Sequence, residues 1–428
     1  MKERVAKSFD IFANKLVQFS QERGRLYWWI FLFVLALTLV SITPFPGHSQ
    51  PTEDLPVESI CQIDSQKEIR GVWLTNVDSD VLFTADKTKE AIALLAGANF
   101  NTLYPTVWNW GYTLYPSKIA ESFTGSALDP TEGLQKRDIL EEMVKLGHKE
   151  GMSVIPWFEF GFMAPADSTL AQRHPEWLTS RQDGSKIWWE GKVHQRVWLN
   201  PLHPEVQQFM TDLIVEIVSN YDIDGIQLDD HFGYPSELGY DDFTVKLYQE
   251  EHEGKSPPKN PQDPDWVRWR ADKITDYVET LFQEIKEHNP NAIISVAPNP
   301  QEFSLNSFLL DWHRWERKGL IEELVVQLYR DDNETFRQEL AQPEIQAARS
   351  HIPVGIGILT GLKGRPISWY KIYQQVRIAR EQKFAGISFF FYESLWNLAA
   401  ETPDSRQAAL KRLFHQQTQR PQVKDCQS

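Results

Sequence analysis

Acidic side chains stand at the ends of several short apolar runs in this chain of 428 residues. They are Glu159 in SVIPWFEF (153–160), Asp229 in GIQLDD (225–230) and Glu393 in GISFFFYE (386–393). If each run is a buried strand, a carboxylate at its end is costly unless it is paired or takes part in chemistry. Two carboxylates about 5–5.5 Å apart suit cleavage of a glycosidic bond with retention of configuration, and about 6.5–9.5 Å suits inversion. The acids therefore indicate glycoside hydrolysis, with both stereochemical outcomes open.

The phase of each strand decides which acid can reach a shared site. Side chains alternate along a strand, so Asp229 should face inward with Gln227, and we expect it to act as nucleophile or as base on a water. Glu159 has the same position on the preceding run. We expect burial to raise its pKa and to keep it protonated as the acid. Glu393 is the alternative acid, although Tyr392 takes the inward phase and Glu393 lies just beyond the strand.

Polar and aromatic side chains at the ends of the same runs are predicted to bind substrate. Amide and phenol groups suit a ligand rich in hydroxyls, and flat rings offer apolar faces to the C–H groups of sugars. The predicted binding residues are Asn76, Trp108, Trp110, Trp157, Asp230, His231, Asn299, Gln327, Tyr329 and Tyr392.

The elements that must position these side chains alternate along the chain. The apolar runs are 71–77, 101–108, 153–160, 225–230, 292–299, 323–329, 354–359 and 386–393. The helical patterns between and after them are 87–98, 138–150, 204–220, 266–288, 306–319, 334–349, 369–382 and 403–416. This alternation predicts an α/β fold of the (β/α)₈ TIM-barrel type, in which chemistry is placed at the carboxyl ends of the strands. An open doubly wound sheet is the alternative, but no GxGxxG loop follows the first run.

Two connections are much longer than usual, at 161–203 and 230–264. Both leave the carboxyl ends of predicted strands and are rich in Trp, Tyr and His, so we expect ordered lids or cleft walls. Other chemistries fit less well. Asp229, Asp230 and His231 could bind a cation, but successive residues on a strand point apart, and we predict neither metal nor cofactor. The chain has no GxSxG motif for a serine nucleophile.

The amino-terminal region differs from the rest. Residues 26–42 are uncharged and apolar and follow Arg23 and Arg25, which favours a transmembrane signal anchor after a cytoplasmic segment 1–25. A signal peptide cleaved after Ser49 is the alternative, and either one predicts export to the periplasm or another extracytoplasmic space. A Pro-rich linker (43–67), the barrel (68–416) and a tail (417–428) follow.

The amino-acid composition limits the classes of partner that the chain could bind. The formal net charge of −15 argues against a nucleic-acid surface. Cys61 and Cys426 bracket the predicted barrel and could form a disulfide or remain free thiols. The oligomeric state is left open.

Five short motifs together resemble the glycosyl-hydrolase-like family 10 domain, over about residues 67–400. They are RGVWLTN (70–76), LYPS (114–117), LNP…HPEV (199–206), DGIQLDD (224–230) and FFFYESLW (389–396). The resemblance implies a (β/α)₈ barrel, export and hydrolysis of glycan chains, and some relatives are linked to the peptidoglycan sugar backbone. The family's aspartate-rich segment falls on Asp229 and Asp230. Many relatives have Asn-Pro where this chain has Glu159-Phe160-Gly161, so the role of Glu159 rests on its position.

The sequence thus predicts an exported glycoside hydrolase acting on a polysaccharide or on peptidoglycan glycan. Two other classes remain open. One is a membrane-tethered barrel that binds glycan without catalysis, and the other is a scaffold of the envelope.

Overall fold

The computed structural model describes residues 67–191 and 193–422. The predicted membrane segment 26–42, Cys61 and Cys426 lie outside these residues. Within the described part, none of the helices combines the length and the apolar character that a membrane crossing requires.

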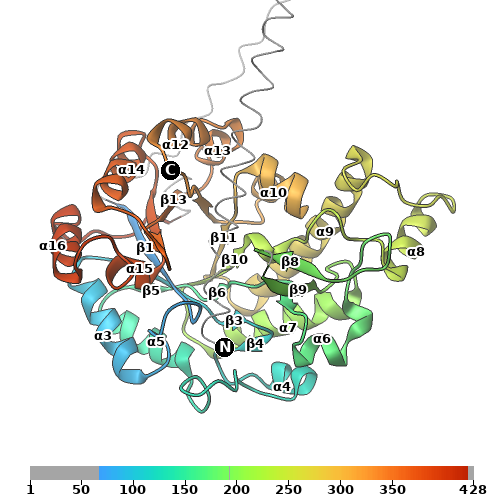
Figure 1. Cartoon of the computed structure of the whole chain (residues 1–428), viewed down its shortest axis with the longest axis horizontal. Coiled ribbons are helices and arrows are strands. Elements are labelled where there is room, and N and C mark those ends of the chain that lie inside the picture. The colour runs from blue at the N-terminus through green and yellow to red at the C-terminus, as the bar shows by residue number, and fades with distance from the viewer. Residues whose placement is uncertain (1–66, 192, 423–428) are drawn as a thin grey trace, which may run out of the picture.

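A curled sheet of parallel strands forms the centre of the molecule, with helices around it (Figure 1). Its order is β5-β2-β1-β16-β13-β12-β11-β10-β6. The strands are β1 (Ile69–Leu74), β2 (Thr102–Pro105), β5 (Ser153–Val154), β6 (Trp157–Phe158), β10 (Gly225–Asp229), β11 (Ile293–Ala297), β12 (Glu323–Gln327), β13 (Val354–Leu359) and β16 (Gly386–Phe390). All eight predicted runs therefore contribute strands to one parallel α/β sheet.

The third predicted strand is broken into two pieces. β5 pairs with β2 and β6 pairs with β10, so both ends of the row of strands come from one segment of chain. Pro156 lies between the pieces and has no N–H to donate to a neighbouring strand. Its carbonyl still accepts a hydrogen bond from the backbone N–H of Gln227 at 2.8 Å, which keeps the segment in the sheet.

The helices around the sheet largely follow the predicted pattern. They are α3 (Ala85–Ala96), α5 (Ile139–Lys149), α7 (Pro204–Asn220), α9 (Pro264–His288), α10 (Gln301–Phe308), α11 (Trp312–Arg317), α12 (Asn333–Leu340), α13 (Pro343–Ala348), α14 (Trp369–Glu381) and α16 (Pro403–Leu413). α7, α9 and α16 each start with proline at the first helical position, where its missing N–H costs nothing.

Two predicted helices were wrong in extent. The helix expected at 306–319 is divided into α10 and α11, because Leu309 has a left-handed backbone that ends α10. The helix expected at 334–349 is divided into α12 and α13, because Pro343 cannot continue α12 and begins a new helix instead.

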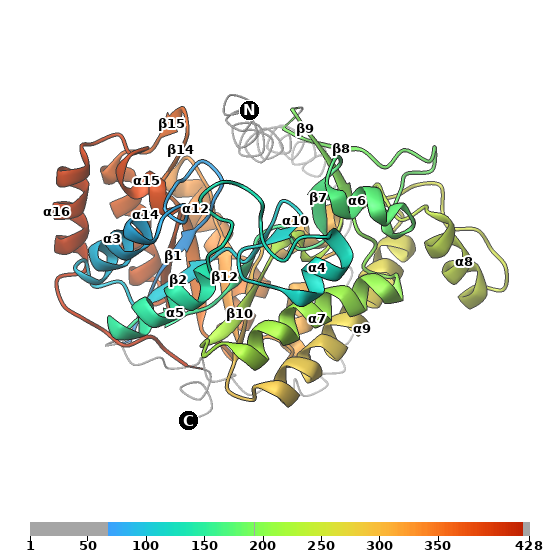
Figure 2. The ribbon, with the colours of Figure 1, turned by 90° about the horizontal axis from the view of Figure 1, so that it is seen from below.

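The connections after the strands carry small elements, several of which lie along one edge of the molecule in Figure 2. They are the hairpin β3 (Trp108–Asn109) with β4 (Tyr112–Thr113), α4 (Lys118–Thr124), the sheet of β7 (Met163–Pro165), β9 (His194–Trp198) and β8 (Trp188–Glu190), α6 (Thr169–Arg173), η1 (Pro175–Trp177), η2 (Asp230–Phe232), α8 (Asp242–Glu251), β14 (Gly361–Leu362) with β15 (Arg365–Pro366), and α15 (Tyr392–Trp396). In their described residues, the first long connection forms the sheet β7-β9-β8, and the second contains α8.

The opposite end of the sheet is covered by the carboxyl-terminal segment. Gln419 forms a parallel bridge with Lys67, just before β1. The next residue, Arg420, forms a buried ion pair with Glu323 at the start of β12. Tyr104 and Ser295 donate hydrogen bonds to the same carboxylate at 3.0 and 2.9 Å. The predicted tail is therefore part of the folded domain as far as residue 422.

Candidate active site

Three carboxylates meet where β6 and β10 end. β10 ends at Asp229, the 3₁₀ turn η2 begins at Asp230, and Glu159 follows β6 directly. Their exposed fractions are 4%, 3% and 4%, so all three are taken out of water. In the described part of the chain, Asp229 and Asp230 form ion pairs only with His231. These acids are thus buried without a lysine or arginine to neutralise them.

Glu159 is held by neutral donors. The Thr75 hydroxyl and the Asn109 side-chain amide donate to its Oε2 at 2.8 and 2.7 Å. Burial raises the pKa of Glu159 to about 8, helped by the negative charge of Asp229 and opposed by the hydrogen bond from Thr75. The carboxyl is therefore protonated at neutral pH. Since both donors point at Oε2, the proton belongs on Oε1, and the group can act as an acid.

The two aspartates are each held by a side-chain amide from another part of the carboxyl end of the sheet. Gln327, at the end of β12, donates to Asp229 Oδ1 at 2.6 Å, and Asn299, after β11, donates to Asp230 Oδ2 at 2.6 Å. Burial raises the pKa of both aspartates above the ordinary value, and the charge of His231 opposes this shift. These amides fix the direction of each carboxylate, so the acids are rigidly placed.

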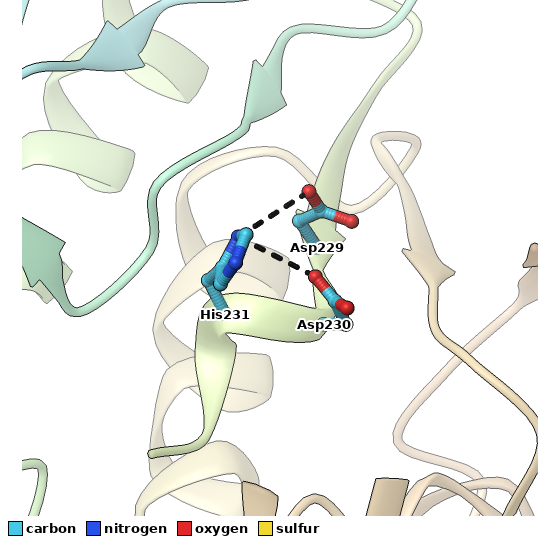
Figure 3. Close-up of side chains that lie close together, drawn as sticks. All are labelled: Asp229, Asp230 and His231. Carbon is cyan, nitrogen blue, oxygen red and sulfur yellow. Dashed lines mark ion pairs between the residues drawn. The ribbon is translucent and has the colours of Figure 1, made fainter. Parts of the chain in front are cut away.

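His231 faces both aspartates (Figure 3). Its Nδ1 is 3.7 Å from Asp229 Oδ2 and 3.4 Å from Asp230 Oδ1. The same atom lies 2.9 Å from the carbonyl oxygen of Glu159, which can only accept, so Nδ1 must carry a proton. Burial lowers the pKa of His231, but the two aspartates outweigh burial and raise it to about 10. His231 is thus a cation shared by two acids.

Asp229, Asp230 and His231 lie closer together than the alternation along a strand predicts. Their ligand atoms all lie within 4.8 Å of one another, because η2 turns Asp230 and His231 back towards Asp229. Successive residues therefore do not point apart here. The Nδ1 proton that the Glu159 carbonyl accepts would have to leave before that nitrogen could bind a metal.

The turn after Glu159 depends on glycine. Gly161 has φ of +47°, and a Cβ at this position would lie 2.4 Å from the carbonyl oxygen of His231. The backbone N–H of Phe162 donates to that same carbonyl at 3.0 Å. Close backbone contact between the two connections therefore sets the position of His231 relative to Glu159.

Partly exposed side chains surround the buried acids. Tyr329 lies close enough for Asp229, Asp230 and Glu159 to affect its pKa, which burial and these charges raise well above 10. Asn76 accepts a hydrogen bond from Asn109, the residue that also holds Glu159. Trp110 packs against Phe160 at 5.4 Å between ring centroids.

Several predicted site residues lie elsewhere. Trp108 is fully buried, donates to the carbonyl of Gly161 at 2.8 Å and packs against Phe209 of α7, so its predicted contact with substrate is wrong. Trp157 is 2% exposed and fills the space beside Trp73, so it also belongs to the core.

The strand predicted at 386–393 was also too long. β16 stops at Phe390, and Tyr392 and Glu393 belong to helix α15. Glu393 accepts hydrogen bonds from Ser79 at 2.9 Å and Asn397 at 2.5 Å. Both Tyr392 and Glu393 line a separate cavity next to α3 and α16. Neither side chain joins the group around Asp229.

Three residues of the site were missed. Thr75 shares the phase of Trp73, whose indole N–H donates to Gln227, so alternation along β1 could have identified Thr75 as inward. Asn109 lies in the hairpin β3–β4, and Glu190 in β8 is near enough to raise the pKa of Asp230. No local pattern signals these two, because their positions depend on how the connections fold over the strands.

Comparisons with other sequences point to one family. The family model described as Glycosyl hydrolase-like 10 matches residues 68–377. Glycosyl hydrolase DigH of Escherichia coli (strain K12) is 26% identical over 346 residues, covering 70% of this chain and 74% of DigH. Glycosyl hydrolase YngK of Bacillus subtilis (strain 168) is 24% identical over 265 residues, covering 57% of this chain and 47% of YngK.

Solved structures show the same type of fold at low identity. The PgaB (BpsB) glycoside hydrolase domain from Bordetella bronchiseptica matches with a TM-score of 0.55 and 11% identity, over 78% of this chain and 100% of that domain. The catalytic domain of a beta-amylase from Paenibacillus polymyxa matches with a TM-score of 0.55 and 10% identity, over 81% of this chain and 98% of that domain.

Proposed function

This chain belongs to the glycosyl hydrolase-like 10 family, and from that membership we propose that it hydrolyses O-glycosidic bonds in a glycan with a carboxylate pair. The observation that carries the proposal is the placement of Glu159 and Asp229 at the ends of the paired strands β6 and β10. Both are buried, and neither is paired with a basic side chain other than His231 among the described residues. The two end strands of the row, β5 and β6, come from one segment of chain. This supports the predicted (β/α)₈ barrel as the framework.

Glu159 supplies the proton in this mechanism. It transfers the proton on Oε1 to the glycosidic oxygen, and the bond from that oxygen to the anomeric carbon breaks. Asp229 then either bonds to the anomeric carbon, to be displaced by water, or takes a proton from a water that attacks the carbon. Both routes consume one water for each bond cleaved. Microscopic reversibility allows Glu159 to act as the base in the second step of the first route.

Asp230 and His231 influence the protonation of the catalytic pair Glu159 and Asp229. The imidazolium of His231 favours the ionised form of Asp229, which a nucleophile or a base requires. Asp230 shares the same imidazolium and is fixed by Asn299. Since desolvation strengthens the interactions among these charges, a small change in any of them should alter the protonation of the others.

An envelope glycan is the proposed substrate class. The predicted export signal would place the domain outside the cytoplasm, where the sugar backbone of peptidoglycan is available. The aromatic and amide side chains Trp110, Asn76 and Tyr329 suit a chain of hydroxyl-rich rings. The proposal therefore includes an exported or membrane-anchored location.

The experiment is a screen of the purified protein against peptidoglycan, other envelope polysaccharides and starch-like polymers. Released reducing ends and the anomer formed first would be measured for the wild type, Asp229→Asn and Glu159→Gln. Asp129→Asn is the matched control, because Asp129 is equally buried and, within the described chain, its side chain accepts only from the backbone N–H of Thr131. Cleavage that survives Asp229→Asn would refute the mechanism. Binding without cleavage by the wild type would instead support the non-catalytic alternative.

A further inference from the structure

An ion pair on the sheet β7-β9-β8 lies near the buried acids. On β9, Arg196 Nε donates to the Glu190 carboxylate of β8 at 2.7 Å. The exposed fractions of the two side chains are 4% and 14%, so the pair is largely shielded from water. The carboxylate of Glu190 is near enough to Asp230 to raise the pKa of that acid. The first long connection therefore brings one anion and one cation to the edge of the candidate active site.

The guanidinium of Arg196 also covers two aromatic rings. It lies 4.5 Å from the ring centroid of Trp110 and 5.1 Å from that of Phe160. Such contacts are attractive, because the faces of the rings are electron-rich and the planar guanidinium stacks on them. Trp110 follows Asn109, which donates to Glu159, and Phe160 follows Glu159 itself. One cation thus ties the connection after β2 to the connection after β6, on both sides of the predicted acid.

The backbone of Trp110 is unusual for so large a residue. Trp110 and Gly111 form the two-residue turn between β3 and β4, with φ of +58° and +78°. Turns with this backbone favour asparagine, aspartate or glycine at the first position, because a Cβ is crowded in the left-handed conformation. A tryptophan there costs free energy, which the contacts of its ring with Arg196 and Phe160 offset. Since such conformations gather at functional sites, this turn points to a function for the ring.

We propose that Arg196 is a positioning residue of the candidate active site, which holds the Trp110 ring for contact with the glycan and neutralises Glu190 beside Asp230. Trp110 is partly exposed whereas Arg196 is buried, so the cation supports the ring from within the protein. The contact between the ring and a sugar rests on the proposed function. The support of the ring and the neutralisation of Glu190 rest on the structure alone.

A double-mutant cycle with Trp110 tests the support of the ring. In steady-state kinetics of the purified full chain, on the polymer that the wild type cleaves in the screen, Arg196→Met should raise KM about threefold and leave kcat nearly unchanged. In the Trp110→Ala background the same substitution should change KM no further, because the ring through which it acts is gone. Arg349→Met is the matched control, because the Arg349 guanidinium lies 4.2 Å from the ring centroid of Phe384, just before β16 at the other end of the sheet. It should leave KM unchanged in both backgrounds.

The neutralisation of Glu190 predicts opposite shifts of the pH profile. In Arg196→Met the carboxylate of Glu190 loses its cation and should raise the pKa of Asp230 further, whereas in Glu190→Gln that charge is gone. The other charged groups that act on Asp230, Asp229 and His231, are present in both variants. The acidic limb of the pH–activity profile, where the aspartates take up protons, should therefore move to higher pH in the first variant and to lower pH in the second. Arg196→Lys keeps the charge but loses the planar face, so its acidic limb should match the wild type while its KM stays raised.

These arms separate the proposal from the hydrolytic mechanism. Additive effects of Arg196→Met and Trp110→Ala on KM, or shifts of the acidic limb in the same direction in Arg196→Met and Glu190→Gln, would each overturn the role of Arg196 and leave the carboxylate pair untouched. Arg196→Lys carries the cycle if Arg196→Met does not fold. If the wild type cleaves no polymer, the cycle is measured by calorimetry on the affinity for a tetramer of N-acetylglucosamine, with the same criterion. A wild type that neither cleaves a polymer nor binds the tetramer would refute the proposed function and the sugar contact of Trp110 together.

Discussion

The curled sheet contains buried acids at both ends of its strands, and the charge partners of these acids differ between the two ends. At the amino end of the strands, Glu323 pairs with Arg420 and accepts from Tyr104 and Ser295. Although burial lowers the pKa of Arg420, the Glu323 carboxylate raises it above its ordinary value, so the pair is charged. At the carboxyl end, Glu159, Asp229 and Asp230 share only His231 among the described residues. One end is neutralised and the other is not.

This difference separates a structural cluster from a functional one. A buried ion pair with all its oxygens bonded fixes the packing of the elements it joins, here the tail and β12. A buried acid without a base has a raised pKa and holds a proton that it can give away. Both clusters lie in the same kind of interior, so burial alone does not identify a site; the excess of acids over cations does.

The largest expected effect is at the carboxyl end. Asp229→Asn keeps the oxygen that accepts from Gln327, so the fold should be retained. Glycan cleavage should fall by about 10³- to 10⁴-fold, because the amide can neither attack carbon nor take a proton from water. Steady-state kinetics give the loss, and urea denaturation should show a free energy of unfolding no lower than that of the wild type. A variant that loses stability but retains its turnover would make Asp229 a structural acid like Glu323.

The converse substitution removes the cation of the ion pair at the amino end of the strands. Arg420→Met leaves Glu323 buried without a cation, and should lower the free energy of unfolding by about 3 kcal/mol. Turnover by the folded fraction should not change, since the pair lies at the other end of the strands. Adding Glu323→Gln to Arg420→Met should recover much of the loss, because both buried charges are then gone. No recovery in the double variant would contradict the assignment of this cluster as an ion pair.

The two ends were not equally predictable from the sequence. Alternation within 225–229 was enough to turn Asp229 inward, and the same rule placed Glu159 despite the break at Pro156. The rule failed at 386–393, because a run of aromatic residues fits a strand and the start of a helix equally well, and the chain turns into α15 at Tyr392. Arg420 gave no signal, since only the folded tail brings it to Glu323.

The stability of the carboxyl end should also depend on pH. Glu159 ionises near its ordinary pKa of 4.5 in the unfolded chain and at about 8 in the folded one. Between these values the folded state binds more protons, so the free energy of unfolding falls as pH rises. Glu159→Gln removes this dependence. The variant should therefore gain stability relative to the wild type from pH 5 to 8, by at most about 1.4 kcal/mol per pH unit.

Urea denaturation of both proteins at pH 5, 6, 7 and 8 measures this difference. His231 also contributes a dependence on pH, since its stabilising charge is fully present below about pH 6.5 and is lost as pH rises through about 10. That contribution is common to both proteins and largely cancels in the difference. A stability difference that stays constant with pH would show that Glu159 titrates normally, and its role as the acid would then fail.

The smallest expected effect concerns the rim of the carboxyl end. Trp110 is partly exposed and follows Asn109, which holds Glu159. The guanidinium of Arg196, a residue of β9, lies 4.5 Å from the centroid of the Trp110 ring. If one face of this ring contacts the glycan, Trp110→Ala should raise KM about 3- to 10-fold and leave kcat nearly unchanged. Trp189→Ala is the matched control, because Trp189 is 50% exposed on β8 but faces away from Glu190, the residue near Asp230. Kinetics on glycans of increasing length measure both variants. Equal effects of the two substitutions would mean that aromatic exposure, rather than position beside the buried acids, governs binding at this end.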